Sequence, residues 1–214
     1  MSLYIPPRQL VPKPNSDDPL DYYYRPVTGT IYRARLRNAV ELLGPAKLKS
    51  LLEVGTGSGI LLPELSRHAD RLVAIDIHDR LPEVRDLLVK EGVRAEVIHG
   101  NLFEMPFENA EFDGLLCASV LEHLTDLDAA LREFARVVAP GGTMVLGFPV
   151  RNVVTDTFFR LAHFDPRHIH PSSHRDIEAA VMRSPDLELV SRVSLPRFVP
   201  LDFSLYEVCR CRRS

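Results

Sequence analysis

Three glycines at alternate positions, Gly55, Gly57 and Gly59, constrain the fold more than any other feature of this sequence. They directly follow a short apolar run, Ser50–Val54, which predicts a buried strand, and directly precede Ile60–His68, which predicts a helix. Glycine is favoured where a chain turns with unusual backbone angles or where a ligand approaches the backbone closely. On this loop alone, a nucleotide site and a purely structural turn are equally good interpretations.

Strand and helix patterns alternate along most of the chain, which is typical of right-handed βαβ units and a parallel sheet. The last two strand-like segments are separated only by a loop, which favours antiparallel pairing. We therefore expect an α/β fold: a Rossmann-like, doubly wound, mostly parallel seven-stranded sheet with an antiparallel C-terminal hairpin. The expected strands are Ser50–Val54, Arg71–Ile77, Arg94–His99, Phe112–Ala118, Thr143–Phe148, Leu187–Ser194 and Ser204–Arg212. The expected helices are one from about Thr28 to the stop at Gly44-Pro45, then Ile60–His68, Leu81–Glu91, Asp126–Val138 and Ser173–Arg183, with a turn at Pro140-Gly141-Gly142.

The length of 214 residues fits one such domain, so we expect residues 1–214 to fold as a single unit. A formal net charge of −3 gives no support for a nucleic-acid partner. No apolar run is long enough to span a bilayer, and the N-terminus lacks a signal-peptide pattern. Three cysteines do not suggest a disulfide framework, so we expect a cytoplasmic protein in which Cys209 and Cys211 are buried thiols.

Asp76 stands at the end of the strand that follows the glycine loop, about twenty residues beyond the first glycine. An acid at this position can accept hydrogen bonds from both hydroxyls of a ribose. The alternative is a turn residue or a helix cap, for which Asp79 is better placed. The spacing therefore favours a ligand role for Asp76.

Glu53, at the end of the first strand, indicates the charge of the ligand. A carboxylate near the end of a buried strand is costly unless a cation or a hydrogen-bond donor lies against it. A ligand with an ammonium and a sulfonium offers such a partner, whereas a pyrophosphate does not. Ile60 also stands where a dinucleotide fingerprint would have glycine or alanine.

The stretch from Glu53 to Gly59 resembles the first motif of class I S-adenosylmethionine-dependent methyltransferases, and Asp76-Ile77 resembles the second. His99-Gly100-Asn101-Leu102 resembles the loop after the third strand, where an aspartate commonly contacts the adenine amino group. Asn101 could accept that hydrogen bond through its carbonyl oxygen. Residues 113–123 are similar to the fourth-strand motif of the ubiquinone and menaquinone biosynthesis (type 11) group, and residues 138–142 to the turn before the fifth strand.

This resemblance covers about Ser50 to Phe148 and implies S-adenosyl-L-methionine as the cofactor. The residues that it places at the cofactor are Glu53, Val54, Gly55, Thr56, Gly57, Ser58, Gly59, Asp76, Ile77, Asn101, Leu102, Cys117 and Ala118.

The reaction that the resemblance implies is direct displacement at the methyl carbon of the sulfonium, by a small-molecule acceptor whose reacting atom stays open. Alignment of the reactants in a dry site can supply much of the catalysis. His123 is the candidate general base, and its alternative role is structural packing before the next helix. A nicotinamide-dependent oxidoreductase, a transferase that uses a decarboxylated cofactor and a non-catalytic binding module remain alternatives on the same sheet.

A metal site is not favoured. Some quinone-pathway relatives place a further glutamate three residues before the Glu122-His123 pair, but this chain has Ser119 there. The histidines after the fifth strand lack cysteines or a regular ligand spacing, which gives zinc no support. These histidines are His163, His168, His170 and His174.

Two segments lie outside the regular pattern. Residues 1–27 are rich in proline and predict an extended arm, in which Tyr22–Arg25 either cover the methionine end of the cofactor or dock the arm on the core. Residues 149–172 have no steady period and predict a lid over the substrate. Four arginines in and near this segment could bind an anionic acceptor, although arginines on a loop are more commonly just solvated. The arginines concerned are Arg151, Arg160, Arg167 and Arg175.

Overall fold

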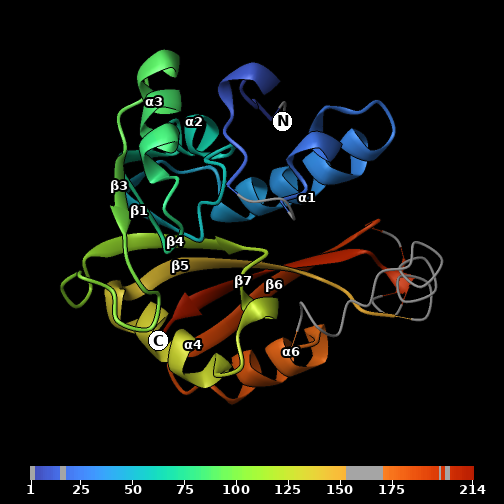
Figure 1. The fold of residues 1–214 in the computed structure, drawn as a ribbon. Coiled ribbons are helices and arrows are strands. Elements are labelled where there is room, and N and C mark those ends of the chain that lie inside the picture. The colour runs from blue at the N-terminus through green and yellow to red at the C-terminus, as the bar shows by residue number, and fades with distance from the viewer. Residues whose placement is uncertain (1–2, 15–17, 153–170, 198, 201–202) are drawn as a thin grey trace.

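A computed structural model describes residues 3–14, 18–152, 171–197, 199–200 and 203–214. Seven strands form one sheet in the order β3-β2-β1-β4-β5-β7-β6 (Figure 1). The first five strands are mutually parallel, and β7 runs antiparallel to both β5 and β6. The predicted α/β fold with an antiparallel C-terminal hairpin is therefore confirmed. The strands are β1 (Leu48–Val54), β2 (Ala69–Asp76), β3 (Glu96–His99), β4 (Phe112–Ala118), β5 (Val138–Pro149), β6 (Leu187–Leu195) and β7 (Tyr206–Arg213).

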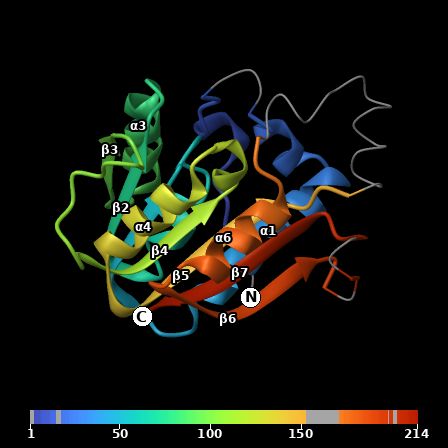
Figure 2. The same cartoon turned by 90° about the horizontal axis from the view of Figure 1, so that it is seen from below.

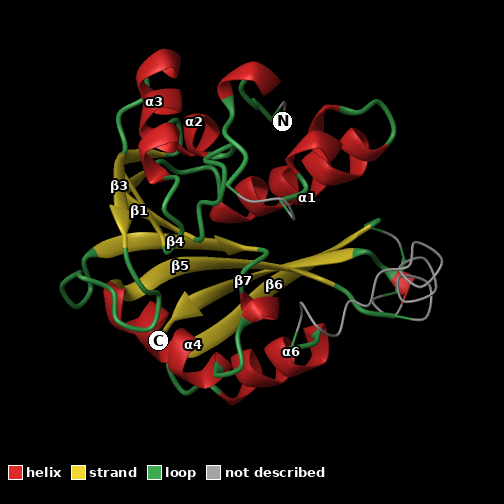
Figure 3. Cartoon of the chain, viewed as in Figure 1, coloured by secondary structure: helices red, strands yellow, loops and turns green. Residues whose placement is uncertain are grey.

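Helices cover both faces of this sheet, as the parallel connections require. On one face lie α1 (Thr28–Leu43), α2 (Leu62–Leu65) and α3 (Leu81–Glu91), and on the other α4 (Leu127–Val137) and α6 (His174–Arg183) (Figures 1 and 3). Seen from below, α4 and α6 lie across the sheet (Figure 2). Alternate side chains of the central strands enter two separate cores: Leu52 and Leu115 pack on the side of α4, whereas Leu51 and Leu116 pack on the side of α1.

The predicted helix Ile60–His68 is wrong in extent, because only Leu62–Leu65 is helical. All residues from Ile60 to Leu65 are buried, so this stretch shows no polar face that would reveal where the helix begins and ends. The three turn residues Ser66–His68 then lead directly into β2.

The fifth strand begins earlier than predicted. Phe112 pairs with Val138, whereas Gly114 pairs with Thr143, so the residues between Val138 and Thr143 bulge out of the register. The predicted turn at residues 140–142 is this bulge within β5, with Gly141 at φ 78°.

The N-terminal segment is not extended throughout, which corrects the prediction for residues 1–27. It forms two 3-10 turns, Arg8–Leu10 and Leu20–Tyr24. Val11, Leu20 and Tyr23 are buried in the core on the side of α1. This burial explains why a proline-rich segment adopts a defined path over the domain.

Candidate functional site

The glycine loop lies at the carboxyl end of β1, between the ends of β2 and β4. Val54 is paired with Ile75 on one side and with Cys117 on the other. The Gly55 N–H donates to the Ile75 carbonyl at 2.9 Å. In open α/β sheets this edge is where ligands bind, at the point where the strand order reverses.

Both Gly55 and Gly57 have a positive φ, and Gly55 is also fixed by close packing. A Cβ at Gly55, where φ is 77°, would lie 2.1 Å from Val120 Cγ2. A Cβ at Gly57 would meet nothing closer than Asp18 Oδ2 at 3.8 Å, but its φ of 53° favours glycine. The Cα of Gly57, in the middle of the loop, is therefore free of close packing.

Glu53 is a buried carboxyl that has no cationic partner in the described part of the chain. Its side chain is 5% exposed and accepts a hydrogen bond from Thr56 Oγ1 at 2.7 Å. The pKa of Glu53 is raised to about 8, mainly by burial; the hydrogen bond from Thr56 lowers it and the nearby charge of Asp76 raises it, both by less than burial does. Within the described residues it forms no ion pair, so a positively charged ligand group would complete its environment.

The Asp76 carboxylate joins the end of β2 to the glycine loop. One oxygen accepts from the Gly57 N–H at 2.7 Å, and the other accepts from the Ile77 N–H at 2.7 Å. The helix α3 that follows begins after Arg80 without a side-chain cap, so Asp76 is not a helix cap. This is the geometry expected of an acid held at the ligand end of the strand.

The other residues assigned to the cofactor differ in exposure. Ile77 is 68% exposed beside Asp76, and Leu102 and Ala118 are half-buried at the same edge. Asn101 Oδ1 already accepts a local hydrogen bond from the Phe103 N–H at 3.0 Å. Cys117 lies wholly in the core, where burial raises the pKa of its thiol.

Two residues at this loop were missed by the sequence reasoning. A ring nitrogen of His78 lies 2.8 Å from the Gly57 carbonyl oxygen, so His78 contacts the loop from the end of β2. Asp18, in the N-terminal segment, lies over Gly57. The position of His78, two residues after Asp76, could have indicated from the sequence that it lies near the loop. No sequence pattern near Asp18 gives such an indication.

The Leu121–His123 turn follows β4 and holds two of the predicted residues in different environments. Glu122 is 3% exposed, and burial raises its pKa to about 8. The side chain of His123, the candidate base, is exposed. Just before the turn, Ser119 adopts φ 59°, and its N–H donates to the Gly147 carbonyl at 2.7 Å.

The tyrosines of the N-terminal segment pack against α1. The Tyr22 ring stacks on Tyr32 at 5.4 Å between centroids, and Tyr23 meets the same ring edge-on at 5.2 Å. The Tyr24 hydroxyl donates to the Pro6 carbonyl at 2.7 Å. Of the two predicted roles for Tyr22–Arg25, these contacts correspond to docking of the N-terminal segment on the core.

Much of the predicted lid lies outside the described residues, including His163, His168, His170, Arg160 and Arg167. His174 is buried at the start of α6, where its Nδ1 accepts from the Arg151 N–H at 3.2 Å. In the described part of the chain, no three His, Cys, Asp or Glu side chains gather in a way that could hold a metal ion.

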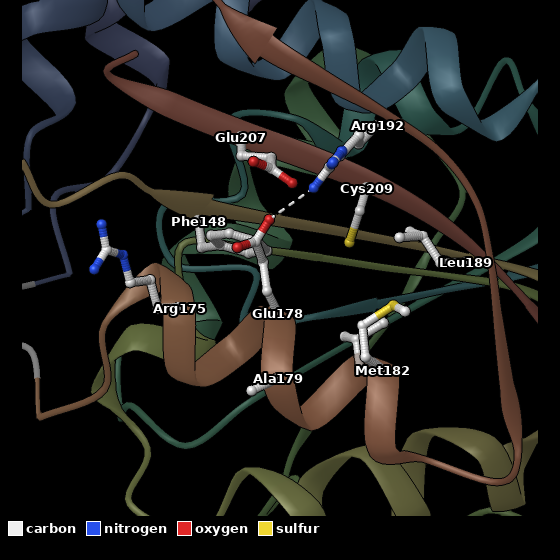
Figure 4. A pocket seen from close by; sticks show the side chains of 10 residues that line it. Phe148, Arg175, Glu178, Ala179, Met182, Leu189, Arg192, Glu207 and Cys209 are labelled. Atoms are coloured by element: carbon white, nitrogen blue, oxygen red, sulfur yellow. Dashed lines mark hydrogen bonds and ion pairs between the residues drawn. The ribbon is translucent and has the colours of Figure 1, made fainter. Parts of the chain in front are cut away.

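A separate cavity of about 450 Å³ lies between α6 and strands β5, β6 and β7 (Figure 4). Its walls are mainly apolar, with Phe148, Leu189 and Met182 among them, and it also contains an ion pair of 3.0 Å between Arg192 and Glu178. Glu207 faces this cavity and is 1% exposed. None of the residues assigned to the cofactor lines it.

The three cysteines are free and buried, as predicted for Cys209 and Cys211. Among the described helices, none has the length and apolar character needed to cross a membrane.

Comparisons with known proteins show which family and which folds this chain resembles. Residues 52–146 match the family described as methyltransferase domain. The demethylmenaquinone methyltransferase of Roseiflexus castenholzii is 35% identical over 106 residues, which cover 49% of this chain and 44% of that protein. The ubiquinone/menaquinone biosynthesis C-methyltransferase UbiE of Pseudomonas putida is 31% identical over 126 residues, or 56% of this chain and 49% of the relative. The matches thus span about half the length of these curated relatives.

The geranyl diphosphate C-methyltransferase of Streptomyces coelicolor, solved with Mg²⁺, geranyl diphosphate and S-adenosyl-L-homocysteine, has the same fold. Its TM-score is 0.70 at 16% identity, over 87% of this chain and 81% of that one. The resemblance to class I methyltransferases of the quinone-biosynthesis group is therefore confirmed as a similarity, and residues 52–146 are the part of the chain that matches the methyltransferase-domain family.

Proposed function

We propose that this protein is an S-adenosylmethionine-dependent methyltransferase that acts on a small-molecule acceptor. The observation that carries the proposal is Glu53, a buried carboxyl next to the glycine loop that pairs with no cation among the described residues. The ammonium of the cofactor's methionine part would supply that cation. The quinone-biosynthesis relatives add support for methyl transfer as the chemistry.

Each side of the glycine loop has a role in holding the cofactor. Asp76 would bind the ribose hydroxyls through lone pairs that its backbone donors leave free. Ile77 and Leu102 offer apolar surface to the adenine, and Asn101 offers its amide. When bound, the cofactor supplies a methyl group on a sulfonium, which is already activated for displacement.

At the acceptor end, the protein's contribution is to align the acceptor and to exclude water. For an acceptor that must lose a proton, His123 is the base indicated by the sequence. The acceptor itself is proposed only as a small molecule, and an anionic acceptor would find Arg151 or Arg175 near the start of α6.

The proposal is tested by titration calorimetry of the protein with S-adenosylhomocysteine, S-adenosylmethionine and NAD. We expect binding of both adenosyl ligands and none of NAD. Asp76→Ala should abolish that binding, whereas the matched variant Asp79→Ala, which removes an exposed acid three residues away, should retain it. Tight NAD binding without a response to S-adenosylhomocysteine would contradict the proposal.

A non-catalytic binding module is separated by a second measurement. Methylated product is sought by mass spectrometry after incubation with S-adenosylmethionine and a set of oxygen, nitrogen and carbon acceptors. Binding of the cofactor without any product across that set would favour the binding module.

A further inference from the structure

The cavity between α6 and strands β5, β6 and β7 is a second candidate binding site of the molecule (Figure 4). Its volume of about 450 Å³ lies within the range of pockets that take small organic ligands, roughly 300 to 1,000 Å³. Phe148 and Leu189 line it from the sheet, and Val181 and Met182 line it from α6. Such walls would hold the hydrocarbon part of a ligand.

Glu207 brings a carboxyl into these apolar surroundings. Glu207 and Cys209 alternate with Val208 on β7, so both side chains point to the α6 face of the sheet. Glu207 is 1% exposed, and its Oε2 has no hydrogen-bond partner among the described residues. A buried carboxyl oxygen without a donor costs free energy, so a donor bound at this point would be favourable.

The charges next to Glu207 do not balance. Glu178 of α6 forms an ion pair of 3.0 Å with Arg192 of β6, and Figure 4 shows the Glu207 carboxyl beside this pair. Two acids therefore share one guanidinium. Burial and the charge of Glu178 raise the pKa of Glu207 to about 7, whereas the charge of Arg192 lowers it. One further positive charge would match the second carboxylate.

The other polar side chains of this cavity do not supply that charge. Arg175 is exposed at the start of α6, and Figure 4 shows its guanidinium pointing away from Glu207. Cys209 of β7 is a thiol whose pKa is raised, mainly by its hydrogen bond with Cys211 and by burial, so it carries no charge. β5 contributes only the uncharged Phe148 to the described lining of the cavity.

A bulge in β6 directs Arg192 to this cavity. Leu189 pairs with Cys211 and Arg192 pairs with Cys209, so the register shifts between Leu189 and Ser191. In a regular strand, residues three apart point to opposite faces, but here both Leu189 and Arg192 line the cavity. Bulges are frequent next to active sites, where they redirect a side chain.

We propose that this cavity is a binding site for a small aliphatic amine, separate from the site at the glycine loop. The ammonium would donate to Glu207 Oε2 beside Glu178, and the hydrocarbon would lie between Leu189 and Met182. An ammonium supplies both a donor hydrogen and a positive charge, whereas a hydroxyl supplies only the donor and a carboxylate supplies neither. None of the residues assigned to the cofactor lines the cavity, so amine binding does not depend on the proposed function.

The first test is calorimetric titration with hexylamine at pH 8.5, where the amine is still charged, as a lysine side chain is. We expect hexylamine to bind about tenfold more tightly than hexan-1-ol, and hexanoate not to bind. Glu207→Gln should lower the affinity for hexylamine about tenfold and leave that for hexan-1-ol within about twofold. The matched control Glu188→Gln removes an exposed acid of β6 that does not line the cavity, and it should behave as the wild type.

The second test locates the probe. The chain has four methionines, of which Met182 lines the cavity. With carbon-13 in the methionine methyl groups, the Met182 signal, assigned by Met182→Leu, should shift when hexylamine is added. The signal of Met105, in the core on the side of α4, should not. Cys209→Leu fills part of the cavity without changing its charge, so it should weaken hexylamine binding by about tenfold or more.

A competition experiment separates this site from the cofactor site. Saturating S-adenosylhomocysteine should change the affinity for hexylamine less than about twofold. Competition between the two ligands would overturn the amine site, and so would no binding of hexylamine or an unshifted Met182 signal. Equal binding of hexylamine and hexan-1-ol, or binding that survives both Glu207→Gln and Cys209→Leu, would overturn it as well. Failure of S-adenosylhomocysteine to bind would contradict only the proposed function.

Discussion

At the scale of single residues, ligand binding at the glycine loop should depend on the buried carboxyl of Glu53. Glu53 is buried beside the glycine loop, and its side-chain partner among the described residues is the uncharged Thr56 hydroxyl. The carboxyl is therefore held largely in its protonated form at neutral pH, with its pKa at about 8. A bound ammonium would reverse that preference, so proton release and ligand binding should be coupled.

We expect the affinity for S-adenosylhomocysteine to rise as the pH is raised from 6 to 8, by up to about tenfold per unit, and to level off above the pKa of Glu53. The reason is that the ligand's ammonium prefers the carboxylate, which forms as pH increases. Calorimetry across this range checks the slope. Glu53→Gln should bind more weakly at pH 8 and show no such slope, and a flat profile in the wild type would contradict the coupling.

The glycines of the loop should respond differently to alanine. Gly55→Ala should cost about 2 kcal/mol of stability or more, because its Cβ would overlap Val120, and Val120→Ala should restore part of the loss. Gly57→Ala should cost about 1 kcal/mol for its positive φ and lower cofactor affinity as well. Denaturant unfolding gives the stabilities. Equal losses for Gly55→Ala with and without Val120 would count against the packing explanation.

At the scale of elements, most strands could be predicted because an apolar or alternating pattern marks them. The apolar run before Gly55 is one example, and the alternation of Cys209 and Cys211 on β7 is another. The start of β5 was missed because its first residues form a bulge, and the extent of α2 was missed because its residues are all buried and show no polar face. Its true length is set by packing between β1 and β2.

The same contrast holds within the candidate site. Glu53, the glycines and Asp76 could be found because they are local in sequence and adjoin predicted strand ends. Asp18 could not, because it reaches the loop through tertiary packing of the N-terminal segment. No pattern near Asp18 distinguishes it from a surface residue.

Helix α6 begins with a reciprocal cap. The Ser173 hydroxyl accepts from the Asp176 N–H, and the Asp176 carboxylate accepts from the Ser173 N–H at 2.8 Å. Ser173→Ala should therefore lower the free energy of unfolding by about 1 kcal/mol. Ser184→Ala at the other end is the matched control: its hydroxyl is buried without a partner among the described residues, so its loss should cost almost nothing. A smaller effect for Ser173 than for Ser184 would refute this account of the cap.

At the scale of the whole molecule, three buried carboxyls should govern how stability depends on pH. Burial raises the pKa of Glu53 and Glu122 to about 8 and that of Glu207 to about 7. An acid with a raised pKa contributes its full stability below the pKa of the unfolded chain, near 4.3, and that contribution is lost as pH rises through the folded-state value. The ligand-free protein should thus lose stability between pH 5 and 8.5.

We expect the Tm of the ligand-free protein to fall across this range in calorimetric scans. Glu207→Gln should raise stability at pH 8.5 by on the order of 2 kcal/mol and change little at pH 5, because it removes the cost of ionising a side chain that faces Glu178. Saturating S-adenosylhomocysteine should reduce the fall of Tm with pH by the contribution that comes from ionisation of Glu53. A Tm that rises from pH 5 to 8.5 would exclude this description.

The placement of Arg35, Tyr23 and Tyr206 has an evolutionary consequence. The loop, Asp76 and the end of β4 come from one contiguous stretch, and residues 52–146 are the part that matches the methyltransferase family. Arg35 donates to the Tyr23 hydroxyl and lies against the Tyr206 ring, and all three residues come instead from the two flanks of the chain, before and after that stretch. Selection can therefore change these flanks while the stretch that matches the family stays constant.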